Sequence, residues 1–358
     1  MEQVRLNRWP VLASAAGSKE IGMVFEAHDT ATQRHRTAWI AAGPSDGPLM
    51  IFVHGWPELS ILWRAQMTHF AAEGWRCVAP DMRGYGGSSI PVATRAYRLE
   101  EIVRDMTQLH DVLGARPAVW IGHDWGSPVV TALAAHQAQR CRAVVAIALP
   151  YFPNGFALDN LVPLVDRSLY PADTYPAGQW DYYLFYQQAF DQAAQDYEAN
   201  VAGTLAAIFR PGSPNAAGKP SPTASVRANG GRFGAAHRAP DARRDPSMMP
   251  QADFDRMVST FTAHGFRGPD AWYLNDAANI AFCRQAPADG RLAQPVLFIN
   301  GAWDAICDIT RGRLGDPMRA ACADLSVVSL EGGHWLMLER PQEVNAAVSS
   351  WLKTHHLS

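Results

Sequence analysis

An aspartate stands where a catalytic nucleophile would be exposed on a sharp turn. Asp124 is the middle residue of Gly122–Gly126 (G-H-D-W-G), which has the form Gly-x-nucleophile-x-Gly. It follows the apolar segment Ala118–Gly122 and precedes the helix-like segment Ser127–Gln139. Small residues at a strand–turn–helix junction permit the tight backbone that exposes the middle side chain. Alone, the motif would also fit an ordinary turn, but its context predicts a nucleophile.

A second carboxylate and a histidine follow in the chain order that triads on α/β folds use. Asp304 comes just after the apolar segment Pro295–Asn300, and His334 comes just after Leu325–Leu330. In an open α/β sheet, ligands bind at the carboxyl ends of the strands, where all three side chains would lie. We therefore predict a triad in which Asp304 orients His334. Asp308 is a competing candidate for the acid, although its spacing from the strand fits less well.

Backbone amides could stabilise negative charge beside the predicted nucleophile. The segment His54–Glu58 (H-G-W-P-E) directly follows the apolar segment Leu49–His54. In triad enzymes of this topology, one amide of the oxyanion hole comes from such a loop and the other from the residue after the nucleophile. We predict that the Trp56 and Trp125 amides form the hole. The Trp-Pro step would also fit a simple turn, which is compatible with this role.

An aspartate nucleophile restricts the reaction. A carboxylate that attacks a saturated carbon forms an alkyl ester whose carbonyl water can attack, whereas a serine would leave an inert ether. The sequence therefore predicts alkyl transfer to Asp124, followed by hydrolysis of the enzyme's own ester. His334, oriented by Asp304, would deprotonate the water, and the oxyanion hole would stabilise the charge on the Asp124 carbonyl oxygen.

The elements that must position these residues alternate between strands and helices. Before residue 150, four apolar segments predict strands at Leu49–His54, Arg76–Pro80, Ala118–Gly122 and Ala143–Leu149, with helices at Leu59–Glu73, Leu99–Leu113 and Ser127–Gln139. The alternation resumes with the strand Pro295–Asn300, a helix near Arg313–Ala323, the strand Leu325–Leu330 and a final helix over Pro341–His355. Such alternation predicts a mostly parallel sheet flanked by helices. We predict one α/β core formed by residues 1–150 and 271–358.

An insertion interrupts this pattern. Residues 151–270 are rich in aromatic side chains and predict helices, as over Trp180–Glu198. They contain a stretch rich in Gly, Pro, Ala and Ser at Pro211–Pro240, and a loop of that length inside a compact domain is usually functional or mobile. We predict that residues 151–270 form a helical lid. The loop at about 211–240 would gate access, contact a second subunit in a homo-oligomer or simply be mobile.

Composition excludes several classes of protein. Lys+Arg is 31 against 34 Asp+Glu, and this net charge of −3 leaves no basic excess for nucleic acid. No apolar run reaches the roughly 18–20 residues of a membrane span, and Met1–Pro10 lacks the apolar core of a signal peptide. The five cysteines are scattered without C-x-x-C, and no H-E-x-x-H occurs. We therefore predict neither disulfides nor a metal site, and expect a cytoplasmic protein.

Together, these motifs resemble the soluble epoxide hydrolases of the α/β-hydrolase superfamily. The resemblance rests on His54–Glu58, Asp81–Ser88 (D-M-R-G-Y-G-G-S), Gly122–Gly126, Phe266–Tyr273 (F-R-G-P, then W-Y) and Gly333–Trp335. It covers about residues 25–355 and is weakest in the middle of the lid. It implies an α/β-hydrolase fold and a cofactor-free enzyme that opens an epoxide to a vicinal diol.

The resemblance also implies two acid groups from the lid. An epoxide oxygen leaves as a strongly basic alkoxide and needs a proton donor, and a tyrosine with a pKa of about 10 can supply one. Tyr273 follows the F-R-G-P segment, and Tyr182 lies in W-D-Y-Y-L-F-Y-Q at 180–187, so both match the epoxide-oxygen tyrosines of the family. Tyr183 and Tyr186 are rivals of Tyr182, because an aromatic stripe on a helix is also typical of core packing.

The substrate would be a small, apolar epoxide. Trp56, Trp125 and Trp335, with Tyr182 and Tyr273, predict an aromatic binding pocket.

Two alternatives stay open. Haloalkane and fluoroacetate dehalogenases also resemble this chain and share the aspartate, and the Trp125 indole could hold a halide, whereas Trp56 fits the epoxide hydrolase pattern. The other alternative is a non-catalytic relative that binds a ligand or partner, since fold alone never proves activity. It is disfavoured because the triad and both tyrosines are present.

Overall fold

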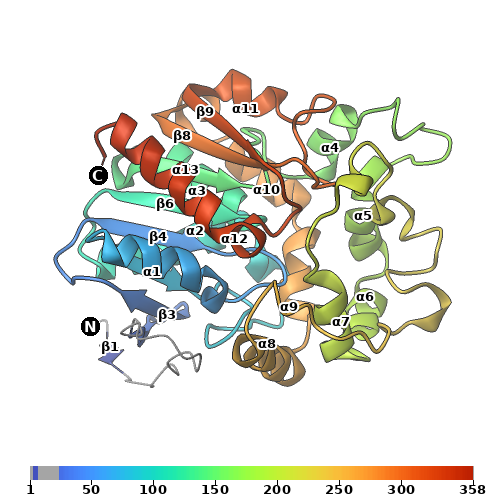
Figure 1. Ribbon diagram of the computed structural model, residues 1–358, viewed down its shortest axis with the longest axis horizontal. Coiled ribbons are helices and arrows are strands. Elements are labelled where there is room, and N and C mark those ends of the chain that lie inside the picture. Colours follow the sequence, from blue (N-terminus) through green and yellow to red (C-terminus); the bar gives the residue numbers. More distant parts are fainter. Residues whose placement is uncertain (1–2, 7–23, 358) are drawn as a thin grey trace.

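The computed structural model describes residues 3–6 and 24–357 (Figure 1). Most of the segment Met1–Pro10, for which no signal peptide is predicted, lies outside the described residues. Among the helices of the described part, none is both long and apolar enough to cross a membrane.

One sheet of nine strands runs through the described part of the chain, in the order β1-β2-β3-β5-β4-β6-β7-β8-β9. The strands are β1 (Gln3–Leu6), β2 (Glu26–Ala31), β3 (Arg36–Ala42), β4 (Leu49–Val53), β5 (Arg76–Pro80), β6 (Ala118–His123), β7 (Cys141–Ile147), β8 (Leu292–Gly301) and β9 (Cys322–Leu330). From β5 to β9 every neighbouring pair is parallel, whereas β1, β2 and β3 pair antiparallel. The predicted mostly parallel sheet is thus confirmed.

The central strands are the ones that the sequence predicts. All residues of β4 and β6 are buried, because helices cover both faces of the sheet, and such strands appear in a sequence as continuous apolar runs. The predicted strands are all present with small differences at their ends. The prediction missed β1, β2 and β3, at the antiparallel end of the sheet. The sequence of β2, E-A-H-D-T-A, mixes polar and apolar side chains, and in β3 the apolar run A-W-I-A-A follows Arg36 and Thr37.

Helices lie on both faces of the sheet (Figure 1). One face carries α1 (Arg64–Ala72), α12 (Leu336–Glu339) and α13 (Pro341–Thr354), and the other carries α2 (Leu99–Val112), α3 (Gly126–His136) and α10 (Asp276–Cys283). A further helix, α11 (Asp316–Ala321), contacts β9 and begins later than predicted. Pro317 near its N-terminus explains the start, because proline is well suited to the first helical turn.

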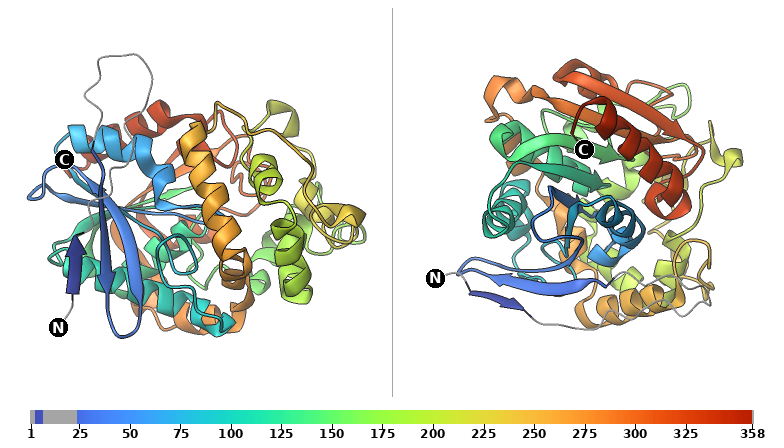
Figure 2. Two further views of the ribbon diagram at one scale, coloured as in Figure 1. Left: turned by 90° about the horizontal axis from the view of Figure 1, so that it is seen from below. Right: turned by 60° about the vertical axis from the view of Figure 1, so that its left-hand side comes forward.

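The chain between β7 and α10 leaves the sheet and forms its own helices. They are α4 (Leu158–Leu161), α5 (Asp181–Gln188), α6 (Phe190–Glu198), α7 (Val201–Ile208), α8 (Gln251–His264) and α9 (Arg267–Asp270). Figures 1 and 2 show α5, α6 and α7 stacked to one side of the sheet. The single helix predicted over Trp180–Glu198 is two helices, because the backbone of Ala189 (φ −137°) is not helical.

Specific hydrogen bonds hold the Gly- and Pro-rich stretch Pro211–Pro240 against its neighbours. The Gly212 amide donates to Glu339 Oε2 at 2.8 Å, and the Thr223 hydroxyl donates to the carbonyl of Gln179 at the same distance. The stretch contains short 3-10 turns rather than long helices. It therefore follows a defined path beside α5 and the loop after β9.

Candidate active site

The turn after β6 carries Asp124 in a strained backbone conformation. Its φ of 49° lies in the left-handed region that residues other than glycine rarely adopt. A Cβ atom on Gly126 would overlap the carbonyl oxygen of Val53, and one on Gly122 would overlap that of Gly126. Both positions must therefore lack a side chain for the strand and α3 to meet at this angle. The turn leaves the Asp124 side chain 12% exposed at the carboxyl end of the sheet.

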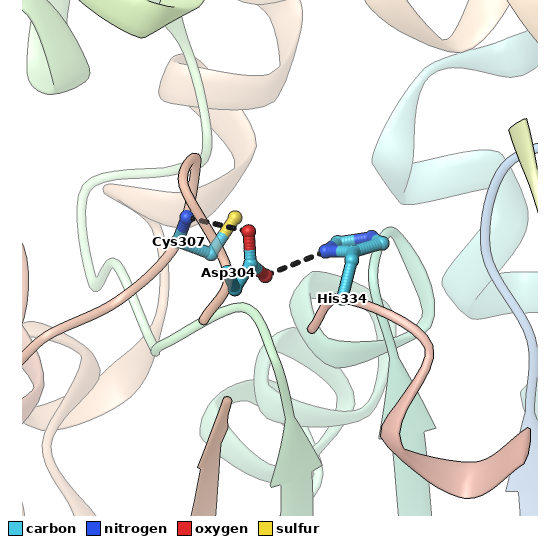
Figure 3. A group of neighbouring side chains, drawn as sticks. All are labelled: Asp304, Cys307 and His334. Atoms are coloured by element: carbon cyan, nitrogen blue, oxygen red, sulfur yellow. Dashed lines mark hydrogen bonds and ion pairs between the residues drawn. The ribbon is translucent and has the colours of Figure 1, made fainter. Parts of the chain in front are cut away.

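His334 lies between two carboxylates. Its Nδ1 is 2.7 Å from Asp304 Oδ2, and its Nε2 is 3.4 Å from Asp124 Oδ2. Asp304 Oδ1 accepts hydrogen bonds from the amides of Ile306 (2.9 Å) and Cys307 (3.1 Å), which fix the carboxylate beside the imidazole (Figure 3). The three residues predicted as a triad are thus adjacent, at the ends of β6, β8 and β9.

Asp308, the competing acid, bonds elsewhere. Its Oδ1 accepts hydrogen bonds from the Asn300 side-chain amide (3.0 Å) and the Thr310 amide (2.9 Å), and it orders the loop after β8 rather than the imidazole. This geometry favours Asp304 as the partner of His334.

The triad has a thiol beside it. Donor atoms of Asp304, Cys307 and His334 lie within 4.8 Å of one another, a grouping that could hold a metal ion. The hydrogen bonds between Asp304 and its partners already account for this grouping. Burial raises the pKa of the Cys307 thiol to about 12, so it is protonated at neutral pH.

Burial and charge act in opposite directions on the triad. Burial alone would lower the pKa of His334, but the charge of Asp304 and the hydrogen bonds of Asp124 and Asp304 outweigh burial and raise that pKa well above its usual value. Burial would raise the pKa of Asp304, but the charge and hydrogen bond of His334 lower it instead. These opposite shifts favour a protonated imidazole beside the Asp304 carboxylate at neutral pH.

The Trp56 amide binds the candidate nucleophile. It donates a hydrogen bond of 2.7 Å to Asp124 Oδ1, as expected for one donor of an oxyanion hole. The Trp56 indole N–H donates to Asp270 Oδ1 at 2.8 Å, which holds the ring in place. In the described part of the chain, the Trp125 amide donates no hydrogen bond to the Asp124 carboxylate. The Trp125 amide as a second donor stays a prediction.

Tyr182 and Tyr273 meet in front of Asp124. Both line the same cavity as Asp124, and their ring centroids lie 5.8 Å apart. Burial is the main cause that raises the pKa of both hydroxyls well above 10, and the charge of Asp124 adds to it. Both hydroxyls therefore stay protonated at neutral pH and can donate hydrogen bonds into the cavity.

The two rival tyrosines have other partners. The Tyr183 hydroxyl bonds to Asp276, and Tyr183 is not part of the described cavity wall. Tyr186 does line the cavity, but its hydroxyl lies 2.7 Å from that of Tyr197. Only the tertiary structure separates these neighbours on α5, and it favours Tyr182.

The cavity in front of Asp124 has a volume of about 220 Å³, and its wall contains Trp, Tyr and Phe side chains beside polar and aliphatic ones. Trp56 and Trp335 belong to this wall, as predicted. The predicted substrate contact of the Trp125 indole stays a prediction, because that ring is not part of the described wall. It is 1% exposed and packs edge-on behind Tyr273, with ring centroids 5.2 Å apart.

Sequence reasoning assigned no role to a buried pair behind His334. His123 Nδ1 lies 2.7 Å from Glu58 Oε1, His123 Nε2 lies 2.8 Å from the His334 carbonyl oxygen, and both side chains are fully buried. A carbonyl oxygen can only accept, so Nε2 carries a proton, and the short contact to Glu58 requires a second proton. The pair therefore carries no net charge. The sequence feature that could have indicated this pair is Glu58, which directly follows H-G-W-P.

We expect Glu58→Ala to destabilise the fold. The substitution leaves His123 Nδ1 without a partner in a fully buried site, at a cost of about 1–3 kcal/mol in the free energy of unfolding. Glu58→Gln is the matched control, because its amide can still bond to the imidazole. Urea denaturation of the two variants and the wild type measures the difference. Equal stability of all three would show that the pair contributes nothing.

Comparison with known proteins places the chain in a family. The family model of the alpha/beta hydrolase fold matches residues 48–341. Epoxide hydrolase A of Mycobacterium tuberculosis is 32% identical over 320 residues, which cover 87% of this chain and 92% of that protein. The crystal structure of epoxide hydrolase A from Mycobacterium thermoresistibile superposes with a TM-score of 0.75 at 30% identity, over 91% of this chain and 98% of that one. An epoxide hydrolase from an endophytic Streptomyces superposes with a TM-score of 0.74 at 30% identity, over 95% of this chain and 98% of that one.

The fold and these matches define an α/β hydrolase, and the predicted fold class is confirmed. Within that superfamily the chain belongs to the epoxide hydrolase family, and it is a hydrolase enzyme.

Proposed function

We propose that this protein hydrolyses epoxides to vicinal diols through a covalent ester on Asp124. One observation carries the proposal. The Asp124 carboxylate, 3.4 Å from His334 Nε2, shares a cavity with the Tyr182 and Tyr273 hydroxyls. A nucleophile, a base and two proton donors therefore surround the same small volume. The names of the relatives support the same activity.

In the first step Asp124 opens the ring. The Trp56 amide holds Oδ1, which leaves Oδ2 as the attacking oxygen. A bond forms from Oδ2 to one ring carbon, the bond from that carbon to the ring oxygen breaks, and the released oxygen takes a proton from Tyr182 or Tyr273. The product is a hydroxyalkyl ester of the enzyme.

Ester formation itself would convert His334 into a base. The ester carries no charge, so one of the two carboxylates that raise the pKa of His334 is lost, and that pKa falls. The proton that His334 releases restores the tyrosine hydroxyl. Neutral His334 then takes a proton from water, and the resulting hydroxide adds to the ester carbonyl.

Collapse of the tetrahedral intermediate would complete the cycle. The Trp56 amide stabilises the oxyanion, and the alkoxide of the diol leaves with the proton of His334. The proton that remains on the Asp124 carboxyl group returns to His334. One oxygen of the Asp124 carboxylate now comes from water, every charge is restored, and the net reaction is epoxide plus water to diol.

Other predictions remain proposals. Residues 151–270 would act as a lid over a core of 1–150 and 271–358, since Tyr182 and the stretch Pro211–Pro240 form part of the cavity wall. The five cysteines are free thiols, which supports a reducing, cytoplasmic location.

Dehalogenation is less well supported than epoxide hydrolysis, because the Trp125 indole lies outside the described cavity wall.

A panel of substrates tests the activity. Purified protein is incubated with styrene oxide and 1,2-epoxyhexane, and in parallel with 1-chlorohexane and fluoroacetate. We expect diol from the epoxides without halide from the other two. Halide release without diol formation would replace the proposal with a dehalogenase and would leave both tyrosines without a catalytic role.

Tyr273→Phe is expected to slow ring opening much more than ester hydrolysis. The substitution removes one proton donor for the leaving oxygen, and general acid catalysis typically contributes about 10²–10⁴-fold. Tyr183→Phe is the matched control, because its hydroxyl bonds to Asp276 rather than facing the cavity. Rapid-mixing measurements of ester formation and decay separate the two steps. Equal slowing of both steps would contradict the assignment of Tyr273 as an acid.

A further inference from the structure

The stretch Pro211–Pro240 places one arginine in the cavity wall. Arg232 lines the cavity together with Tyr186 and Tyr197, and it is partly buried. Its positive charge acts to lower the pKa of both tyrosines, against the larger raising effect of burial. The guanidinium therefore lies close to this aromatic part of the wall.

Arg232 has no protein partner in the described part of the chain. No carboxylate lies within ion-pair distance of its guanidinium there, and no side-chain hydrogen bond involves it. Its neighbours in the sequence differ: Arg227 bonds to Asp181 at 2.6 Å and Arg238 to Asp241 at 2.7 Å. An arginine that is partly removed from water without an acceptor loses hydration without compensation.

The carboxyl groups around Tyr197 do not serve as this acceptor. Asp196 Oδ1 lies 3.1 Å from His237 Nδ1, and Asp270 Oδ1 accepts from the Trp56 indole. Burial raises the pKa of Asp270 well above its usual value, which favours an uncharged acid there. The positive charge of Arg232 is therefore available to a ligand in the cavity.

Charge and volume together restrict that ligand. Among the described wall residues, Arg232 and His334 are the basic ones, and His334 is paired with Asp124 and Asp304. A single guanidinium balances a single negative charge and fits the two oxygens of a carboxylate. A cavity of about 220 Å³ accommodates a short chain rather than a long one.

We propose that the cavity takes short epoxides that carry a carboxylate group, with Arg232 as the residue that binds this group. The inference rests on the proposed function for the epoxide part, but the anion site is independent of turnover. It gives the stretch Pro211–Pro240 a role, which is to supply a specificity-determining cation. The carboxylate binds at Arg232, in the part of the wall formed by Tyr186 and Tyr197, while the epoxide reaches the nucleophile.

Binding of two unreactive probes tests the anion site directly. Calorimetric titration measures hexanoate and its uncharged analogue hexanamide against wild type, Arg232→Gln and Arg238→Gln. Arg238→Gln is the matched control, because it removes the same charge from an exposed position on the same stretch. We expect wild type to bind hexanoate about tenfold or more tighter than hexanamide. Arg232→Gln should lose this preference, whereas Arg238→Gln should keep it.

Two results would overturn the inference: equal binding of acid and amide by wild type, or a preference that survives in Arg232→Gln. Circular dichroism and melting curves of the variants establish that each is folded.

The ratio of kcat/KM for 5,6-epoxyhexanoate to that for 5,6-epoxyhexanamide then extends the test to turnover, and Arg232→Gln should lower this ratio about tenfold or more. Turnover of both epoxides at equal efficiency by wild type would also overturn the anion site while leaving the hydrolase activity intact. Absence of any epoxide turnover, with acid-selective binding retained, would remove the proposed function alone.

Discussion

Asp124→Ala is expected to lower the rate of epoxide hydrolysis by at least about 10⁴-fold. Without the carboxylate no ester can form, and the remaining groups can only assist direct attack by water. The measurement is diol formation from styrene oxide by wild type and variant, followed to the detection limit. Asp308→Ala is the control, because it removes a carboxylate from the same edge of the sheet. The Asp308 carboxylate bonds to Asn300 and Thr310 and not to His334.

A second measurement distinguishes loss of the nucleophile from loss of the fold. The Asp124→Ala protein should keep a cooperative unfolding transition, since Asp124 lies on the cavity wall rather than in the core. If a folded Asp124→Ala protein kept more than a few per cent of the wild-type rate, the ester mechanism would be wrong, and water activated by His334 would have to attack the epoxide directly.

His334→Gln is expected to trap the alkyl-enzyme. Ring opening requires the Asp124 carboxylate and a tyrosine, both of which remain, whereas hydrolysis of the ester requires a base that glutamine cannot provide. Mass spectrometry of the intact variant after incubation with an epoxide should show an increase equal to the mass of one substrate molecule. Steady-state turnover should fall by about 10³-fold or more.

Peptide mapping places the adduct. The proposal requires the added mass on the peptide that contains Asp124, and Asp124→Ala/His334→Gln should show no adduct. A His334→Gln protein that turns over at the wild-type rate would remove His334 from the mechanism. A protein that neither turns over nor gains mass would mean that His334 is needed for ring opening, so that the imidazolium rather than a tyrosine would be the proton donor.

The sequence alone was sufficient for the core of the sheet and for the candidate triad. Strands buried on both faces appear as apolar runs, and G-H-D-W-G after such a run predicts the turn observed at Asp124. Asp304 and His334 each follow a strand of the same parallel sheet. Parallel strands bring their carboxyl ends to one edge, so the order of strands in the chain already predicts that these side chains meet.

The tertiary structure decided what local pattern could not. The antiparallel strand β2 carries no apolar run. Neighbouring tyrosines on α5 differ only in direction, so the structure was needed to identify the partners Asp276 and Tyr197. The indole of Trp125 is turned into the core, although its sequence position is beside the nucleophile.

Contacts between distant parts of the chain are the other contribution of the structure. Glu58 and His123 are 65 positions apart, and Arg232 reaches the cavity from a stretch without regular periodicity. The physical reason is the same in each case. Periodicity and turn chemistry are local properties of a sequence, whereas the partner of a polar side chain depends on which remote segments pack around it.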